Sequence, residues 1–248
     1  MKVSYFHVQF GFSPFRPTLL RAIPRFLGER KSYLRKGGRI SHSFPILKDY
    51  TDLAGTTSGH YFHQDLLVSQ YIFQKNPKQH VDVGSRIDGF VAHVASFRII
   101  EILDIRAIPQ SEHPNIIFRQ TDLMSSSETE LVDSISCLHA IEHFGLGRYG
   151  DPINPSGHLL GFKNLVRMLK HGGDLFISFP IGSKNEVHFN AHRVFHPMDI
   201  FLWPGSSELK LLSFDYVDDL GALHRNHDLQ GRIPLVTYGC GIYSFSKI

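Results

Sequence analysis

Residues 80–90, HVDVGSRIDGF, and residues 99–106, IIEILDIR, decide the fold of this chain. In each segment a short apolar run ends at an acid, Asp82 in the first and Asp104 in the second, and Gly84 closely follows Asp82. A parallel α/β sheet presents a nucleoside in this way, with a tight turn after one strand and a carboxylate at the tip of the next. The two segments therefore predict an α/β fold with a ligand site at the carboxyl ends of these strands.

Beyond these segments, apolar runs alternate between strand-like and helix-like patterns. The expected strands cover residues 80–83, 99–105, 116–118, 134–138, 174–179, 209–216 and 234–245, and the expected helices cover residues 64–74 and 161–169. We expect the second helix to stop at residues 170–173 (KHGG), and the strand after it to end at Pro180. The alternation predicts a Rossmann-like, mostly parallel sheet covered on both faces. The last two strands have no evident helix between them and predict an antiparallel edge at the C-terminus.

The bulk composition is that of an ordinary globular protein. Of the 248 residues, 42% are hydrophobic and 20% are charged, and no window approaches the roughly eighteen apolar residues of a membrane span. The first residues lack the basic and apolar regions of a signal peptide, and the chain contains only Cys137 and Cys240 as cysteines. These features predict a cytoplasmic protein without a transmembrane segment or a disulfide framework. Cys137 is expected to be a buried, inert thiol.

Charge is distributed unevenly along the chain. Residues 1–48 contain ten lysines and arginines and one acid, Glu29, a net charge of +9; the rest carries −6, because the whole chain carries +3. We expect a basic, partly irregular leader at residues 1–55 and one domain at residues 56–248. The leader indicates contact with an anionic surface or, alternatively, a solvated helical face. Nucleic acid is not the expected partner, because the basic residues are not interleaved with aromatic ones.

The turn after the first strand narrows the class of nucleoside ligand. A dinucleotide site requires G-x-G-x-x-G, but Arg86 occupies the position of the second glycine after Gly84. A phosphate-binding G-x-x-x-x-G-K-[ST] loop is also absent from the sequence. A ligand with a ribose and no pyrophosphate fits better, and S-adenosylmethionine is the common example. Its carboxylate could use the turn amides or Arg86, and Asp104 could accept both ribose hydroxyls.

The order of motifs along the chain extends this interpretation. The sequence reads VDVGS (81–85), LDIR (103–106), TDL (121–123), LHAIEH (138–143) and LKHGGDLFISFP (169–180). This order resembles that of a class I S-adenosylmethionine-dependent methyltransferase, although the second glycine of that superfamily's turn is missing.

Four longer strings resemble one narrower family. They are SGHYFHQDL (58–66), HVDVGSRIDGFVAH (80–93), SCLHAIEHFGLGRYGDP (136–152) and FNAHRVF (189–195). They look like family 268 of the domains of unknown function, over about residues 45–200. The resemblance implies a methyltransferase-like fold and brings no established activity or substrate.

The resemblance to methyltransferases implies where the cofactor would bind. The implied cofactor-binding residues are Asp82, Gly84, Ser85, Arg86, Asp104, Ile105, Asp122, Leu123 and His139. Among these, Asp104 corresponds to the ribose-binding acid, and Asp122 to the residue that binds the adenine amino group. Two alternatives stay open: Asp122 as a helix N-cap or loop residue, and Asp82 as a residue that orders the turn.

The expected catalytic residues follow the fourth strand. If the acceptor is a hydroxyl group, a base must take its proton, and a histidine beside a carboxylate suits this role at neutral pH. We expect His143 to be that base, with Glu142 or His139 orienting it or the substrate. The alternative is that Glu142 and His143 cap the following turn.

The expected acceptor site lies in two later segments. The glycine-rich loop at residues 145–151 could close over a substrate, with Arg148 and Tyr149 as contacts, or could be a flexible connection. His192 and Arg193 follow the fifth strand at the carboxyl edge and are expected to line the same pocket. Four residues precede the first helix and could reach the cofactor, or pack aromatic and imidazole groups beneath the leader: His60, Tyr61, His63 and Gln64.

Sixteen histidines raise the alternative of a metal site. His188, His192 and His196 are four residues apart, a spacing that would stack ligands on one face of a helix. We expect no metal, because proline and asparagine place this segment in a loop and no zinc-protease motif is present.

The sequence therefore predicts S-adenosylmethionine-dependent methyl transfer to a small-molecule or glycan hydroxyl group. A non-catalytic module that keeps the fold and binds a partner is the first alternative. A metal-dependent hydrolase is the second.

Overall fold

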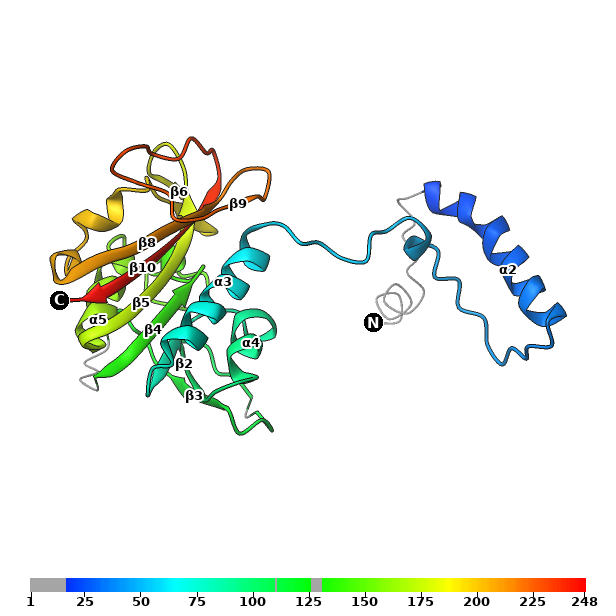
Figure 1. Ribbon diagram of the computed structural model, residues 1–248, viewed down its shortest axis with the longest axis horizontal. Coiled ribbons are helices and arrows are strands. Elements are labelled where there is room, and N and C mark those ends of the chain that lie inside the picture. Colours follow the sequence, from blue (N-terminus) through cyan, green and yellow to red (C-terminus); the bar gives the residue numbers. More distant parts are fainter. Residues whose placement is uncertain (1–16, 110, 126–130) are drawn as a thin grey trace. The chain divides into compact units, whose positions relative to one another are not determined.

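The central sheet has the strand order β3-β2-β1-β4-β5-β10-β8-β9 (Figure 1). Its strands are β1 (His80–Val83), β2 (Ile100–Asp104), β3 (Ile116–Gln120), β4 (Val132–Leu138), β5 (Leu169–Ile181), β8 (Leu209–Val217), β9 (Leu223–His224) and β10 (Gly239–Lys247). The first five strands in this order are parallel, whereas β10 is antiparallel to both β5 and β8. The computed structural model thus confirms the predicted Rossmann-like α/β fold with an antiparallel C-terminal edge.

The structure describes residues 17–109, 111–125 and 131–248. The chain divides into two units between Thr56 and Thr57. The sheet and both clusters of buried apolar side chains belong to the C-terminal unit. Within the described ranges, no helix combines the length and apolarity needed to cross a bilayer.

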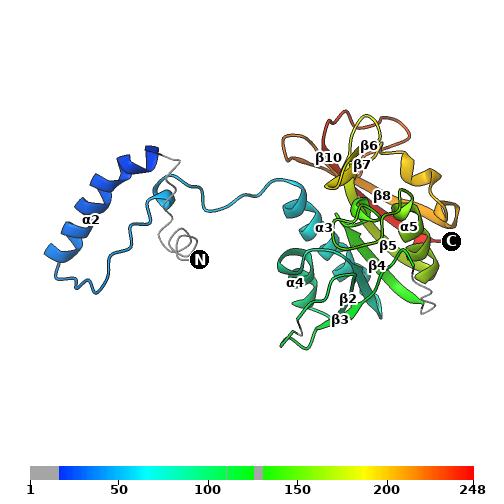
Figure 2. The same ribbon diagram turned by 180° about the vertical axis from the view of Figure 1, so that it is seen from behind.

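Helices cover both faces of the sheet (Figure 2). In the C-terminal unit the helices are α3 (His60–Lys75), α4 (Ala92–Ala95) and α5 (Gly157–Met168), with short helical turns at Ile87–Val91, Ile141–His143, Asp199–Leu202 and Ser206–Glu208. The N-terminal unit contains α2 (Ile23–Arg35) and short turns at Pro17–Ala22 and Lys48–Tyr50. On one face, Val68, Ile72 and Val94 of α3 and α4 pack against the sheet; on the other, Phe162 and Leu165 of α5 do so. Both faces are buried, which explains why the central strands are mostly apolar rather than strictly alternating.

The connection from α5 to β5 differs from the expected helix stop. α5 ends at Met168, but residues 170–173 belong to β5, where they bulge opposite the single residue Asp133 of β4. Gly172 has a φ of +78°, a conformation that glycine adopts without strain. Lys170 forms an ion pair with Asp133 (Nζ–Oδ1 3.0 Å), which joins the two strands at this end of the sheet.

The expected end of β5 at Pro180 is also wrong, because the strand continues to Ile181. A proline lacks an N–H donor but keeps its carbonyl, and the Pro180 carbonyl accepts a hydrogen bond from the Phe195 backbone N–H (3.0 Å). The neighbouring parallel strand β4 has already ended at Leu138, which is paired with Ser178.

The segment after β5 is a hairpin rather than a loop. β6 (Glu186–His188) pairs antiparallel with β7 (His192–Val194), and His188 lies opposite His192 with ring centroids 5.0 Å apart. His196 follows β7, and its backbone N–H donates to Asn185 Oδ1 (2.6 Å). These histidines therefore do not share a helix face, which was the premise of a metal-dependent hydrolase.

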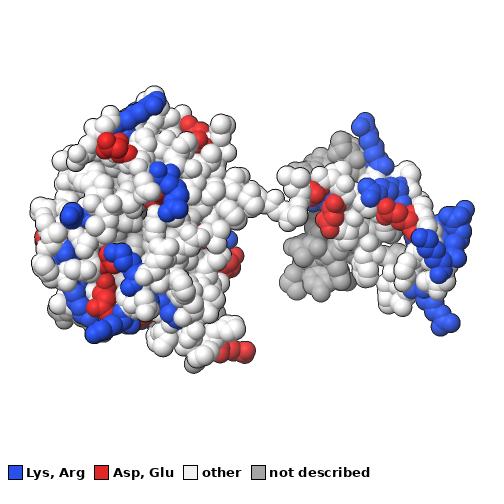
Figure 3. Space-filling view, viewed as in Figure 1, with Lys and Arg blue, Asp and Glu red and all other residues white. Residues whose placement is uncertain are grey.

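The N-terminal unit is built around α2. Pro24 is tolerated because it stands in the first turn, where backbone N–H groups have no partner within the helix. No side chain of α2 is buried, and Leu47 is the buried residue in the described part of this unit. Figure 3 shows lysine and arginine side chains gathered along this helix.

Candidate active site

The turn after β1 is ordered by hydrogen bonds to Asp82. Its carboxylate is fully buried and accepts from the Ser85 backbone N–H (3.0 Å), the Ser85 hydroxyl (2.6 Å) and the Ser136 hydroxyl (2.6 Å). Ser85 Oγ in turn accepts from the Leu138 N–H (3.1 Å), which ties the turn to β4. Burial raises the pKa of Asp82 to about 6, against the effect of these donors. Asp82 thus orders the turn and does not line a pocket.

Gly84 brings the backbone close to the end of β4. Its φ is +69°, and a Cβ atom at this position would lie 3.0 Å from the Ala140 Cβ. Its N–H donates to the Leu103 carbonyl (3.0 Å), so the turn after β1 is also tied to β2. The position therefore favours glycine both for its conformation and for the space available.

Asp104 at the tip of β2 is paired with an arginine that the sequence did not assign to the site. Its carboxylate accepts from the Arg106 backbone N–H (2.8 Å), from Arg106 Nε (2.9 Å) and from Arg106 Nη2 (2.6 Å). The Arg106 guanidinium also lies over the Tyr149 ring, 4.3 Å from its centroid. Both oxygens that could accept ribose hydroxyls are therefore engaged by Arg106.

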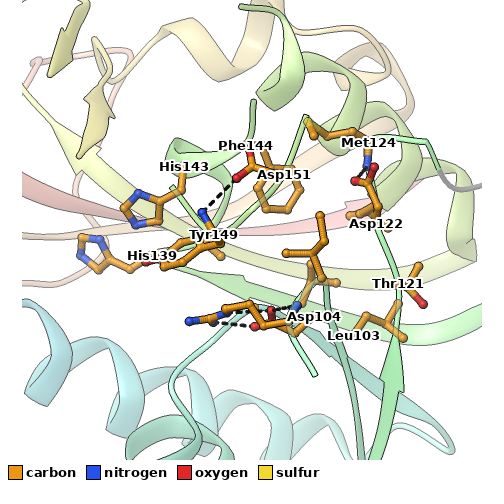
Figure 4. Close-up of a pocket in the computed structure, with 16 residues that line it drawn as sticks. Leu103, Asp104, Thr121, Asp122, Met124, His139, His143, Phe144, Tyr149 and Asp151 are labelled. Carbon is orange, nitrogen blue, oxygen red and sulfur yellow. Dashed lines mark hydrogen bonds and ion pairs between the residues drawn. The ribbon is translucent and has the colours of Figure 1, made fainter. Parts of the chain in front are cut away.

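Two adjoining pockets open at this edge of the sheet, and Figure 4 shows the residues of the first. The first is lined by Val83, Gly84, Leu103, Asp104, Ile105, Arg106, Thr121, Asp122, Leu123, Met124, His139, Ala140, His143, Phe144, Tyr149 and Asp151. The second adds Tyr61, Ser85, Arg86, Ile87, Asp88, Ala107, Ile108, Glu142, Arg148, His192 and Tyr238. The structure thus brings all the predicted site residues together except Asp82 and Arg193.

Arg193 and Asp122 have mainly local partners. Arg193 is buried, and its guanidinium donates to the carbonyls of Glu142 (3.2 Å), Phe144 (2.7 Å) and Pro155 (3.2 Å). Asp122 lines the first pocket, but its Oδ1 accepts from the Met124 N–H (2.9 Å), as in a capped turn. Arg193 therefore holds the segment after β4 in place, whereas Asp122 still presents a carboxylate to the pocket.

The residues after β4 form a linked set of titratable groups. His139 has a φ of +49°, and its Nδ1 lies 2.9 Å from Glu142 Oε1. His143 Nε2 lies 3.6 Å from the same oxygen. Burial disfavours the charged forms of both His139 and Glu142. The hydrogen bond with His139 nevertheless lowers the pKa of Glu142. Cys240 and Glu142 together raise the pKa of His139. Glu142 is therefore an ionised carboxylate at neutral pH.

His143 has a defined tautomer when it is neutral. Its Nδ1 lies 2.7 Å from the Ala191 carbonyl, which only accepts, so the proton is on Nδ1 and the lone pair is on Nε2. Burial lowers the pKa of His143, against the effect of Glu142. The neutral imidazole thus presents Nε2 as a proton acceptor near neutral pH.

Three buried polar atoms beside the second pocket have no hydrogen-bond partner among the described residues: His139 Nε2, Glu142 Oε2 and His192 Nε2. An unpaired buried polar group costs about 1–3 kcal/mol, so native proteins usually supply a partner or a ligand. The loop after these residues is itself well held, because Asp151 accepts from the N–H groups of Gly145 (2.7 Å) and Tyr149 (3.1 Å). The loop is therefore organised around Asp151.

Arg106 and Tyr238 are among the pocket residues that the sequence did not assign to the site. Arg106 stands two residues after Asp104 at a strand tip, a position from which its role could have been predicted. Tyr238 lies just before β10 and lines the second pocket, almost one hundred residues after His139. Only the folded topology brings it there.

The comparisons with known proteins agree with the fold. Residues 117–217 match the model of a family described as Caenorhabditis protein of unknown function, DUF268, which confirms the resemblance found in the sequence. No protein of curated function matches the sequence.

Several solved structures share the fold. 1,6-Didemethyltoxoflavin-N1-methyltransferase from Burkholderia thailandensis, with bound 1,6-didemethyltoxoflavin and S-adenosylhomocysteine, is 11% identical, with a TM-score of 0.54 over 95% of this chain and 92% of that chain. An S-adenosylmethionine-dependent methyltransferase from Clostridium acetobutylicum is 12% identical, with a TM-score of 0.51 over 75% of this chain and 92% of that one. The [4+2]-cyclase SpnF is 12% identical, with a TM-score of 0.53 over 92% and 96%. At such identities the likeness shows the fold alone, and the cyclase shows that this fold is not restricted to methyl transfer.

Proposed function

We propose that this chain catalyses S-adenosylmethionine-dependent methyl transfer to the hydroxyl group of a small-molecule or glycan acceptor. One observation carries the proposal: the Gly84 turn, the Asp104 carboxylate and the acceptor nitrogen of His143 meet at one cavity. The similarity in fold to methyltransferases supports the proposal. Because one fold can host many reactions, the reaction itself must be argued from the residues of the site.

The first pocket suits the nucleoside part of this cofactor. Leu103, Leu123 and Met124 provide an apolar wall for an adenine ring, and Asp122 offers an acceptor for its amino group. The Asp104 carboxylate would accept the ribose hydroxyls once Arg106 withdraws from it. The residues present therefore fit the cofactor, with Arg106 as the group that must move.

When bound, the cofactor supplies an electrophilic methyl group. The chain must then hold the acceptor hydroxyl in line, exclude water and remove its proton. His143 suits the last task, because its Nδ1–H is donated to Ala191 and its Nε2 is left to accept the proton. Glu142, 3.6 Å from Nε2, would stabilise the resulting imidazolium.

The second pocket suits an acceptor that carries a ring and a negative charge. Tyr61, Tyr149 and Tyr238 supply aromatic surface. Arg148 donates to the Ala191 carbonyl (2.7 Å) and forms no ion pair within the described ranges, so its charge is available to an anionic group. Arg86 is already paired with Asp88.

A non-catalytic binding module is the second candidate, and the Asp104–Arg106 pair favours it. If Arg106 holds the carboxylate permanently, the ribose site stays closed and the pockets serve another ligand. Cofactor binding separates the two candidates.

The test is calorimetric titration of the purified chain with S-adenosylmethionine and S-adenosylhomocysteine, with NAD as the control ligand. Micromolar binding of the first two and none of NAD is expected. Asp104→Ala should weaken binding by about 5- to 150-fold, the loss of charged hydrogen bonds worth roughly 1–3 kcal/mol. Asp133→Ala, at the amino end of β4, is the matched control and should leave affinity unchanged. Absence of binding in the unmodified chain would overturn the proposal.

A further inference from the structure

Beside the second pocket, three side chains from distant parts of the chain bring metal-ligating atoms together. His60 is the first residue of α3, His139 follows β4 and Cys240 lies in β10. One ligand atom from each, a histidine nitrogen or the cysteine sulfur, lies within 4.8 Å of the others. The rings of His60 and His139 are stacked, with centroids 5.3 Å apart. No local sequence spacing predicts this cluster, because it depends on the order of the strands.

The polar atoms of the cluster are poorly satisfied. His139 Nε2 is buried and has no hydrogen-bond partner in the part of the chain that the structure describes. Cys240 is fully buried, and the contacts of its sulfur with Gln64 Oε1 and with the Gly241 carbonyl are long, at 3.8 Å. A histidine nitrogen and a cysteine sulfur are thus held beside each other, and neither has a hydrogen bond of normal length to another group of the described residues.

The other nitrogen of His139 has the partner that a metal-bound histidine usually has. His139 Nδ1 lies 2.9 Å from Glu142 Oε1. In metal sites a carboxylate commonly accepts the remaining N–H of the ligating imidazole, which fixes the tautomer and orients the ring. Glu142 would play this part and leave His139 Nε2 to face the ion.

We propose that His60, His139 and Cys240 form a binding site for a divalent cation of intermediate softness, with Zn²⁺ as the expected ion. Two imidazole nitrogens and a thiolate suit Zn²⁺, whereas Mg²⁺ and Ca²⁺ prefer oxygen ligands. On binding, the Cys240 S–H bond breaks, a sulfur–metal bond forms and the proton passes to solvent. The proton that His139 holds on Nε2 is likewise released to solvent, so that both imidazoles ligate as neutral groups. The ion retains a fourth position for water or another ligand.

The geometry requires only a local contraction. Tetrahedral zinc with bonds of about 2.0–2.3 Å places its ligand atoms roughly 3.4–3.6 Å apart. The ligand atoms already lie within 4.8 Å of one another, and the stacked rings of His60 and His139 would have to turn so that their in-plane lone pairs converge on the ion. Because His60 is only partly buried, the ion has a route to the cluster from the surface of α3.

The site has a consequence for the neighbouring residues. An ion on His139 Nε2, with Nδ1–H donated to Glu142, leaves that imidazole no free lone pair, so His143 is the proton acceptor of the pocket. The metal site goes beyond the proposed methyl transfer and does not depend on it.

The test is titration of the full chain, freed of metal by chelator dialysis, with Co²⁺ as a spectroscopic substitute for Zn²⁺. We expect one Co²⁺ per chain and an absorption band from thiolate-to-cobalt charge transfer, reversed by Zn²⁺ and unaffected by Mg²⁺. Cys240→Ser should abolish the band. Cys137→Ser, which replaces the other buried cysteine, should keep it.

His60→Ala provides a second variant at a position that is only partly buried, with folding checked by circular dichroism. It should weaken Co²⁺ binding at least tenfold, and His63→Ala, one turn further along α3, should not. The inference is overturned if the unmodified chain binds no stoichiometric Co²⁺, if the band persists in Cys240→Ser, or if His60→Ala binds Co²⁺ normally. A parallel titration with S-adenosylhomocysteine separates this outcome from failure of the proposed function.

Discussion

Arg106 determines how the Asp104 carboxylate can be used. The guanidinium contacts both carboxylate oxygens, so a ribose and Arg106 compete for the same acceptors. The Arg106 side chain is 48% exposed, and ion pairs with an exposed partner contribute only about 0–1 kcal/mol to stability. Withdrawal of Arg106 from Asp104 therefore costs little free energy. The competition between Arg106 and the ribose should be measurable as a modest effect on the affinity for S-adenosylhomocysteine.

We expect Arg106→Ala to strengthen S-adenosylhomocysteine binding by up to about fivefold, since the ligand no longer displaces an ion pair worth roughly 1 kcal/mol. Calorimetric titration measures the change. Arg119→Ala removes an arginine paired with Glu101 on the same sheet and should leave affinity unaltered. Weaker binding by Arg106→Ala would instead make Arg106 a contact of the ligand.

His80 makes the stability of the C-terminal unit sensitive to acid. It is buried in β1 between the hydroxyls of Ser134 (Nδ1–Oγ 2.9 Å) and Ser136 (Nε2–Oγ 3.1 Å). Ser136 donates its proton to Asp82, so it accepts from His80 Nε2–H, and His80 Nδ1 accepts from Ser134. A second proton on the ring would break the bond from Ser134. Burial, reinforced by Arg98, accordingly lowers the pKa of His80 from 6.5 to about 3.

The unfolded chain binds a proton on His80 more tightly than the folded chain does. The contribution of neutral His80 to the unfolding free energy is therefore complete above pH 6.5 and is lost as the pH falls toward 3. Each pH unit within that window should cost about 1.4 kcal/mol from His80 alone. His80→Gln should reduce the slope of unfolding free energy against pH by this amount, as measured by urea denaturation between pH 4 and 6. His113→Gln, at an exposed histidine, is the control, and an unchanged slope in His80→Gln would contradict the assignment.

From the sequence alone we could predict that residues at the carboxyl end of a strand would meet at the site. Gly84, Asp104 and His143 each lie at or soon after the carboxyl end of a strand, so the fold alone brings them to one cavity. Tyr238 and Cys240 reach the same region from the last strand, which is inserted between β5 and β8. That insertion is a property of the complete sheet, and no short motif encodes it.

At the scale of elements, the same distinction holds. β1 matches the expected strand at residues 80–83, and α3 ends within one residue of the expected position, before Asn76 with its φ of 45°. The expected start of α3 was wrong, because the helix begins at His60 and residues 60–64 lie inside it. The bulge at residues 170–173 was not predicted, because a glycine pair after a helix indicates a stop whether or not the next residues join a strand. The hairpin at β6 and β7 was missed for a related reason: three-residue strands are too short to show alternation.

The turn after β1 yields a prediction that separates strain from crowding. Gly84 and Gly172 both have positive φ, at +69° and +78°, but only at Gly84 does an added Cβ meet another side chain, the Ala140 Cβ at 3.0 Å. We expect both alanine substitutions to lower the unfolding free energy by about 1 kcal/mol from strain, and Gly84→Ala to lower it further.

Only Gly84→Ala should also weaken S-adenosylhomocysteine binding, by at least tenfold, because Gly84 and Ala140 both line the first pocket. Adding Ala140→Gly to Gly84→Ala removes the crowded contact and should restore part of the affinity while the strain remains. Denaturation and calorimetric titration measure the two effects. Equal losses of affinity in Gly84→Ala and Gly172→Ala would show that the turn acts only through stability.

At the scale of the whole molecule, the buried apolar core and the excess positive charge lie in different units. Both clusters of buried apolar residues lie after Thr57, so the C-terminal unit holds its own core. The N-terminal unit carries the excess positive charge, with Arg21, Arg25, Lys31 and other basic residues exposed (Figure 3). This division suggests that the ligand pockets and the basic helix act separately.

The helix α2 combines exposed apolar and basic side chains. Leu27 and Leu34 lie seven residues apart on one helix face and are 55% and 42% exposed. Apolar residues on one side with basic residues around them favour the interface of an anionic bilayer, where each lysine or arginine contributes about 1 kcal/mol. The one acid of α2, Glu29, is already paired with Arg25 (2.8 Å).

We therefore expect the full chain to co-sediment with vesicles that contain phosphatidylserine and not with phosphatidylcholine alone. Binding should fall steeply at about 0.5 M salt, where charges are screened within a few ångströms. Removal of residues 1–56 should abolish vesicle binding and leave S-adenosylhomocysteine affinity unchanged, because the pockets lie wholly in the C-terminal unit. Replacing Leu27 and Leu34 by alanine should weaken vesicle binding without altering its dependence on salt. If the truncated chain still sediments with the vesicles, the contact belongs to the C-terminal unit and the basic helix is a solvated surface.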